Sequence, residues 1–209
     1  PTVLGAVVLT YNVPSLGETK LKLDAPTIAD IFLGKITKWN DARIAAQNPG
    51  AALPATDLMV VHRADGSGTT YVFVDYLAKV SEEWKSKVGV ATSVSWPVGL
   101  GGKGNEGVTQ QVKQLEGTIG YVELVYALAN KLSYASVKNQ AGSYVDPTLE
   151  AVSAAAASAE LPPTTDFRVS ITNAAGPTAY PIASFTWLLI HSDNPKPEVA
   201  VEIRDFLTW

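Results

Sequence analysis

Strand-like and helix-like patterns of apolar positions follow one another along the whole chain. Residues 3–11 form a continuous apolar run, which is typical of a strand buried on both faces. Polar and apolar residues alternate at 20–24, and this predicts a half-buried strand. Apolar stretches at 58–62 and 183–193 predict two more strands of the core.

Helical spacing of apolar residues fills the intervals between these strands. Thr27 and Asp30 are spaced like a capping box ahead of a short helix that ends at Gly34. Asn40 and Ser81 are placed to cap two further helices. Four more helices are expected: one from about Thr69, one at 108–115 capped by Asn105, one at 146–159 and one at 194–209.

The remaining segments complete an α/β pattern. We expect strands at 92–98 and 117–123, a glycine turn at 99–104 and a loop at 160–166. Strands that alternate with helices predict a parallel or mixed sheet flanked by helices. The chain opens inside a predicted core strand and its last helical pattern has not ended at the final residue, so we expect truncation at both ends.

Composition narrows the possible functions only modestly. The 209 residues, 46% of them hydrophobic and 17% charged, suit a globular protein with a sizeable core. A net charge of −4 without a basic stripe argues against nucleic-acid binding. The absence of cysteine excludes disulfides and thiol chemistry. No apolar run reaches the roughly 18 to 20 residues that span a bilayer.

The segment HRADGSGTT, residues 62–70, carries the strongest candidate chemistry. It joins a predicted strand to a predicted helix, whose first N–H groups lack intrahelical partners. The helix dipole adds about half a positive charge there, so an anion can bind. Ser67, Thr69 and Thr70 would add hydroxyl donors, and Arg63 a permanently charged planar cation.

Three neighbouring residues would support this anion site. Gly66 and Gly68 permit backbone angles and close approaches that a Cβ would obstruct. Asp65 could hold the guanidinium of Arg63 in place and offset part of its charge. A plain capped turn with a surface ion pair stays open as an alternative.

Other chemistries are less well supported by the residues. Ser67 could act as a nucleophile only with a base, and the two histidines, His62 and His191, lie in no nucleophile elbow and have no metal-ligand spacing. The segment GLGGKG satisfies G-x-G-x-x-G, with Glu123 near the distance of the acidic partner, but Pro97 makes the preceding strand a poor match. We expect these glycines to form a turn beside the cleft. Scattered tryptophans are expected to pack in the core.

Many segments in order resemble the PstS-like branch of the periplasmic binding proteins, the phosphate receptors of bacterial ABC transporters. They include RADGSGTT, LTYNVP, LGKITKWND, WPVGLGGKGNEGV, GTIGYVE and FTWLLIH, and the resemblance covers essentially the whole chain. It implies a type II, two-lobed α/β fold. Residues 1–12 would be a crossover strand and part of lobe 1, 13–183 would be lobe 2, and 184–209 the return crossover strand and the start of a lobe 1 helix.

The resemblance also implies a function and its residues. Inorganic phosphate would be bound by Arg63, Ser67, the N–H of Gly68 and Thr69, with Asp65, Gly66 and Thr70 in support, and without metal, cofactor or catalysis. The protein would be periplasmic, or extracellular and membrane-associated, and would deliver phosphate to the membrane subunits of an ABC permease.

The resemblance further implies that some ligands are absent from this chain. A first-lobe segment that supplies further ligands would be missing, possibly present as another chain, so this chain alone should bind phosphate weakly. An interaction or scaffold module without tight phosphate binding, and a phosphate-ester hydrolase, remain the alternatives.

Overall fold

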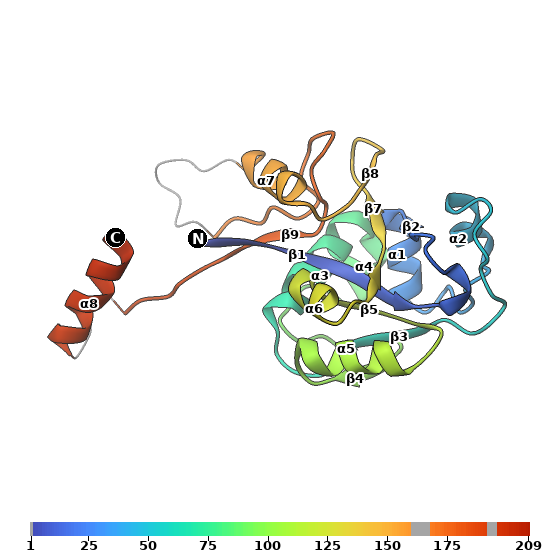
Figure 1. The fold of residues 1–209 in the computed structure, drawn as a ribbon, viewed down its shortest axis with the longest axis horizontal. Coiled ribbons are helices and arrows are strands. Elements are labelled where there is room, and N and C mark those ends of the chain that lie inside the picture. Colours follow the sequence, from blue (N-terminus) through green and yellow to red (C-terminus); the bar gives the residue numbers. More distant parts are fainter. Residues whose placement is uncertain (1, 160–167, 192–195) are drawn as a thin grey trace.

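A mixed six-stranded sheet forms the centre of the protein in a computed structural model that describes residues 2–159, 168–191 and 196–209 (Figure 1). Its strands pair in the order β4-β3-β5-β1-β6, and β9 pairs with the other end of β1. The strands are β1 (Val3–Asn12), β3 (Met59–Arg63), β4 (Leu100–Gly102), β5 (Thr118–Glu123), β6 (Ser133–Tyr134) and β9 (Ala183–Thr186). A separate three-stranded sheet contains β2 (Lys22–Leu23), β7 (Ser136–Lys138) and β8 (Tyr144–Val145).

The long strand β1 organises the main sheet. Its second half, from Val7 to Asn12, runs antiparallel to β5, and its first residues pair antiparallel with β9. The strand β3 is parallel to both β4 and β5. Because β3 and β4 are parallel, their carboxyl ends lie at the same edge of the sheet, and each runs on into a helix there. The predicted mixed sheet with flanking helices is confirmed.

Helices cover both faces of this sheet. Successive residues of β5 point to opposite faces: Gly120 lies against Val108 and Val112 of α5, whereas Tyr121 stacks on Phe73 of α3. The helices are α1 (Ala25–Phe32), α2 (Ala42–Gln47), α3 (Gly68–Val80), α4 (Glu82–Lys87), α5 (Gly104–Gln114), α6 (Leu124–Ala129), α7 (Leu149–Ala157) and α8 (Pro197–Thr208), with a 3₁₀ turn at Pro14–Leu16.

Helix starts show where short-range patterns mislead. The side chain of Asp24, not Thr27, caps α1, and Asp41, not Asn40, caps α2. In both cases the carboxylate belongs to the non-helical residue directly before the helix and accepts a backbone N–H of the first turn, that of Thr27 in α1 and that of Arg43 in α2. Helix α5 begins at Gly104, so Asn105 lies inside it and does not cap it. The cap formed by Ser81 on α4 is confirmed.

Two predicted strands need correction. No strand forms at 92–98; the strand in this region is β4, inside the glycine segment that was expected to be only a turn. Pro97 offers no N–H to a ladder, whereas Leu100 to Gly102 pair with β3. The strand predicted at 183–193 ends at Thr186, because its partner β1 begins at the facing residue Val3.

Beyond β9 the chain leaves the body of the protein. Residues 187–191 form neither strand nor helix, and residues 192–195 lie outside the described part of the chain, as does the whole loop predicted at 160–166. The helix predicted at the C-terminus is confirmed as α8, which has no buried residue and lies apart from the sheet in Figure 1. None of the helices in the described ranges combines the length and apolarity of a bilayer span.

Candidate functional site

The turn at residues 63–70 leads from the carboxyl end of β3 into α3. Ser67 is extended (φ −147°, ψ 131°), and its Oγ accepts the N–H of Thr70 at 3.1 Å. Its own N–H donates to the carbonyl of Thr92 at 2.8 Å, which pins the turn to the loop after α4. Ser67 is therefore the N-cap of α3, as its position before an apolar helical pattern suggests.

The N–H groups of Gly68 and Thr69 are the open end of this helix. Both belong to the first turn of α3, where the backbone donors have no intrahelical acceptor. None of the hydrogen bonds among the described residues uses these two N–H groups. Gly68 is exposed and Thr69 half-buried, so an anion can reach both donors at the positive end of the helix dipole.

Arg63 and Asp65 form a bidentate ion pair beside this helix start. The Nε–Oδ1 and Nη2–Oδ2 distances are 2.8 and 2.6 Å. The guanidinium holds the pKa of Asp65 well below its usual range, and Asp65 in turn raises the pKa of Arg63. Since a guanidinium has five N–H donors, Arg63 keeps the donors on Nη1 for a further partner. Its side chain is only 9% exposed, so it is a fixed and not a mobile cation.

Asp65 also closes a second helix start. Its Oδ1 accepts the N–H of Gly104, the first residue of α5, at 3.0 Å. The carboxylate therefore lies between Arg63 and the start of α5. Its charge is largely neutralised there, and the start of α3 is left facing outward.

The start of α3 opens into a groove of about 600 Å³. Gly68 and Thr69 line one side, and the first residues of β1 together with β9 line the other. Glu123, the last residue of β5, also lies in the groove, and burial raises the pKa of its carboxyl. The residues that line the groove thus include two with unused backbone donors and one partly buried carboxyl.

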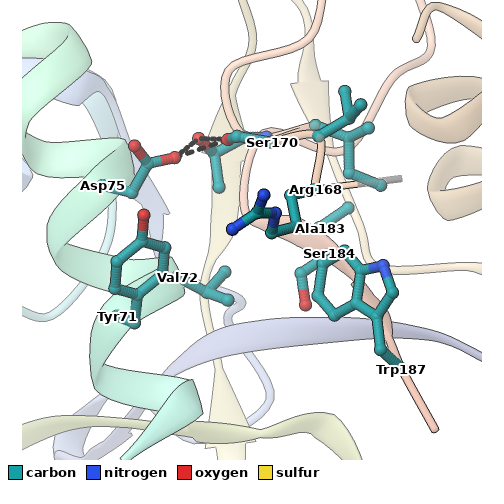
Figure 2. A pocket seen from close by; sticks show the side chains of 11 residues that line it. Tyr71, Val72, Asp75, Arg168, Ser170, Ala183, Ser184 and Trp187 are labelled. Atoms are coloured by element: carbon teal, nitrogen blue, oxygen red, sulfur yellow. Dashed lines mark hydrogen bonds between the residues drawn. The ribbon is translucent and has the colours of Figure 1, made fainter. Parts of the chain in front are cut away.

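A smaller cavity of about 280 Å³ lies further along α3 and shares Tyr71, Val72, Ser184 and Trp187 with the groove. Figure 2 shows Arg168 extending into it between the rings of Tyr71 and Trp187. At its polar end Asp75 accepts hydrogen bonds from Ser170, at 2.6 Å, and from Thr172. The cavity contains no helix start, whereas the groove contains the start of α3.

The residues predicted to bind the anion all lie in the 63–70 turn, but Thr70 does not have the predicted role. Arg63, Ser67, Gly68 and Thr69 lie at a single turn. Thr70 does not present its hydroxyl to the groove: it is 1% exposed, and its Oγ1 lies 2.7 Å from the hydroxyl of Tyr121. The expectation of a third hydroxyl donor there was wrong, because Thr70 is one helical position too far round and faces the core.

The glycines of the turn were also expected to permit special backbone angles. Neither Gly66 nor Gly68 has a positive φ, so neither adopts a backbone conformation that requires glycine. A Cβ at either position would meet no atom within 4 Å. What these two glycines leave is open space beside the turn, and only Gly68 lines the groove.

Two residues that support the turn could not be assigned to it from the sequence around the turn. Tyr121, on β5, contacts the backbone N–H of Arg63 at 3.2 Å as well as Thr70. Asn105, on α5, reaches Thr69 Oγ1 with its amide nitrogen at 3.4 Å and accepts the N–H of Glu123. Both lie far along the chain from the turn and are brought to it only by the sheet. A polar-tipped tyrosine inside the apolar strand at 117–123 was the one available hint.

The expectation that the tryptophans pack in the core is confirmed for Trp39 and Trp84 and wrong for Trp187 and Trp209, which are 37% and 100% exposed. His62 stacks on Trp96, with 4.8 Å between ring centroids, and Trp39 and Trp84 are fully buried. Among the described residues, no group of three His, Asp or Glu side chains could hold a metal ion. In GLGGKG, a Cβ on Gly102 would lie 2.7 Å from the backbone of Val108, so that glycine serves helix–strand packing.

Comparison with known proteins places these features in a family. The chain matches the model of the PBP superfamily domain over residues 1–209. It is 50% identical over its full length to a protein of Xylella fastidiosa strain 9a5c, and 46% identical to one of Pasteurella multocida, both named phosphate-binding protein PstS. It spans 57% and 61% of these relatives, that is, less than two thirds of their length.

Solved structures share the same fold. A high affinity periplasmic phosphate-binding protein solved with bound phosphate aligns with a TM-score of 0.77 at 24% identity. The alignment covers 100% of this chain and 61% of that one. A second structure, described as a DING protein, aligns with a TM-score of 0.75. With the family model matched from the first residue to the last, the chain belongs to the PBP superfamily.

Proposed function

We propose that this chain binds inorganic phosphate at the 63–70 turn and passes it to an ABC import permease without chemical change. The observation that carries the proposal is the open start of α3: the unused N–H groups of Gly68 and Thr69 line a groove, and the fixed guanidinium of Arg63 lies in the same turn, although Arg63 and Ser67 are not among the residues that line the groove. Relatives up to 50% identical are named phosphate-binding proteins, which favours phosphate as the anion.

The donors suit a tetrahedral oxyanion. Arg63 offers the N–H groups that Asp65 does not use, Gly68 and Thr69 offer backbone N–H groups, and the hydroxyls of Ser67 and Thr69 complete the set. Ser67 Oγ already accepts the N–H of Thr70, and its own hydrogen is left to donate to a further acceptor. The net charge of −4 gives no general attraction for anions, so these local dipoles must supply the binding.

The same contacts argue against catalysis. The oxygen of Ser67 is engaged as a helix cap, and no basic side chain is among its hydrogen-bond partners in the described residues. His62, the histidine next to the turn, stacks on Trp96 and directs Nδ1 to the carbonyl of Arg63. A hydrolytic role for Ser67 would require a base that these contacts do not provide.

We propose further that this chain supplies most of one lobe of a two-lobed receptor. Residues 13–183 would form that lobe, while residues 1–12 and 184–209 would lead to the other. The antiparallel pairing of β1 with β9, from Val3 opposite Thr186 to Ala6 opposite Ala183, is consistent with two neighbouring crossover strands. The relatives are longer, so the remaining ligands would come from a segment outside these 209 residues, in the same chain or in another, and phosphate bound to this chain alone would be held weakly.

The proposed place of action is the periplasm, or the outer side of the membrane, with the membrane subunits of the permease as partners. The alternative is an interaction or scaffold protein that keeps the fold without binding phosphate tightly. The following test distinguishes it from a phosphate receptor.

Titration calorimetry with phosphate tests the proposal directly. Arg63→Ala should abolish measurable binding, because it removes the one fixed cation at the start of α3. Arg43→Ala is the matched control: that arginine is also ion-paired to aspartates, but it lies on the surface in the first turn of α2. Phosphate binding that survives Arg63→Ala unchanged would refute the assignment of the site.

A further inference from the structure

The hydroxyl group of Tyr121 contacts both ends of the 63–70 turn. The oxygen of Tyr121 accepts the backbone N–H of Arg63 at 3.2 Å and lies 2.7 Å from Thr70 Oγ1. Arg63 ends β3, and Thr70 lies in the first turn of α3. We propose that Tyr121 is a positioning residue that fixes the guanidinium of Arg63 relative to the start of α3 and thereby sets the affinity for phosphate. This inference rests on the proposed function.

The ring that carries this hydroxyl is held rigidly. Tyr121 is fully buried and stacks on Phe73 at a centroid distance of 4.5 Å and on Trp96 at 5.5 Å. Phe32 packs against it from α1. An aromatic ring has few rotatable bonds, so a ring packed on several sides fixes its oxygen in space at low entropic cost. The hydroxyl therefore acts as a stationary point to which both ends of the turn are attached.

The hydroxyl also keeps its proton wherever the protein would be used. Burial raises the pKa of Tyr121 to about 12. A neutral tyrosine can accept from Arg63 and share its own hydrogen with Thr70 at the same time. Both contacts hence persist together across the neutral pH range.

Positioning matters here because the ligand needs two groups at once. A phosphate must contact the guanidinium of Arg63 and the N–H groups of Gly68 and Thr69, which lie at opposite ends of the turn. If the turn could vary in width, binding would have to order it, and that cost would reduce the affinity. The Tyr121 bridge removes this cost before the ligand arrives.

A second buried tyrosine provides the control. Tyr76 lies on α3 and is fully buried like Tyr121, but its hydroxyl has no hydrogen-bond partner among the described residues. Tyr76→Phe deletes the same atom from the same core without touching the turn. Tyr121→Phe keeps the stacked ring and deletes only the bridge.

Phosphate titration of the 209-residue chain and its variants tests the role. Tyr121→Phe and Thr70→Val should each weaken binding by roughly 5- to 30-fold, the range expected when a buried hydrogen-bonded group loses its partner. The double variant should be no weaker than the single ones, since both remove the same bridge. Thr70→Ser, which keeps the hydroxyl, should restore affinity, and Tyr76→Phe should leave it unchanged.

Amide hydrogen exchange without ligand supplies an independent readout. Tyr121→Phe should accelerate exchange at the N–H of Arg63, while the amides of α1 exchange as in the wild type. Wild-type affinity and wild-type exchange in Tyr121→Phe would overturn the positioning role and leave phosphate binding standing. If the wild type binds no phosphate, the proposed function fails, and the exchange of the Arg63 amide still decides whether Tyr121 fixes the turn.

Discussion

Two strand–turn–helix units lie side by side in this protein and differ in what they leave exposed. The strands β3 and β4 are parallel neighbours, with Arg63 opposite Gly102, and they lead into α3 and α5. The first unit leaves the N–H groups of Gly68 and Thr69 facing a groove. In the second unit the N–H of Gly104 is already taken by Asp65. A carboxylate from the first turn thus occupies a backbone donor at the start of α5 and leaves those at the start of α3 unused.

The glycines of the two turns differ in the same way. A Cβ on Gly66 or Gly68 would meet open space, whereas one on Gly102 would lie within 3 Å of the backbone of α5. Gly104 has a φ of +70°, which favours glycine for conformational reasons. Glycines in the first turn leave open space that a ligand could occupy, and those in the second serve packing and chain reversal.

The largest effect that separates the two units should come from Gly68→Pro. Proline is well tolerated at the first position of a helix, and Ser67 before it is already extended, as a residue preceding proline should be. The substitution therefore removes one N–H donor without disturbing α3. A hydrogen bond to a charged group contributes about 1.5–3 kcal/mol, so phosphate affinity should fall roughly 10- to 100-fold in calorimetry.

Gly68→Ala controls for the added volume in that experiment. It keeps the N–H, and its Cβ meets no atom within 4 Å in the protein, so it should bind more tightly than Gly68→Pro. Equal losses in the two variants would show that space at this position, and not the N–H donor, limits phosphate binding.

The contacts within the 63–70 turn could be predicted from the sequence, whereas the contacts of this turn with residues far along the chain could not. The cap formed by Ser67 and the pairing of Arg63 with Asp65 involve residues close together in the chain, so composition and spacing contain them. The contacts of Tyr121 with Arg63 and of Asp65 with Gly104 depend on which strands become neighbours in the sheet. Nothing in the G-x-G-x-x-G spacing indicates that the first N–H of α5 is already occupied.

The fold shows the same division. The strands β1, β3 and β5 can be recognised from their own sequences, because each contains a run of apolar residues that marks it as buried. The length of β9 is set by its partner, since pairing stops where β1 begins, and no pattern within 183–193 contains that limit. Short strands such as β4 exist only because a neighbour pairs with them, so the sequence pattern placed a strand at 92–98 instead.

Gly102→Ala should sharpen the contrast through stability. Its Cβ would lie 2.7 Å from Val108 N and 2.8 Å from Gly107 C, which are backbone atoms and cannot rotate away. Overpacking of this kind costs typically about 1–3 kcal/mol in the free energy of unfolding, measured by denaturant titration. Gly66→Ala in the other turn should leave that free energy unchanged or raise it by up to about 1 kcal/mol, because the alanine fits and restricts the unfolded chain. A comparable loss in both variants would contradict the packing role assigned to the second turn.

The smallest effect concerns the cap, which α3 has and α5 lacks. Ser67→Ala should cost about 1 kcal/mol in the free energy of unfolding, the usual loss for an N-cap serine. Ser81 caps α4 in the same way, with its Oγ accepting the N–H of Trp84 at 3.2 Å, so Ser81→Ala should cost a similar amount. Under the proposed function, only Ser67→Ala should also weaken phosphate binding, because only that serine caps the helix start to which the phosphate is proposed to bind. If both variants lose stability and neither loses affinity, Ser67 is a cap alone, and the anion is held by the guanidinium and the backbone of α3.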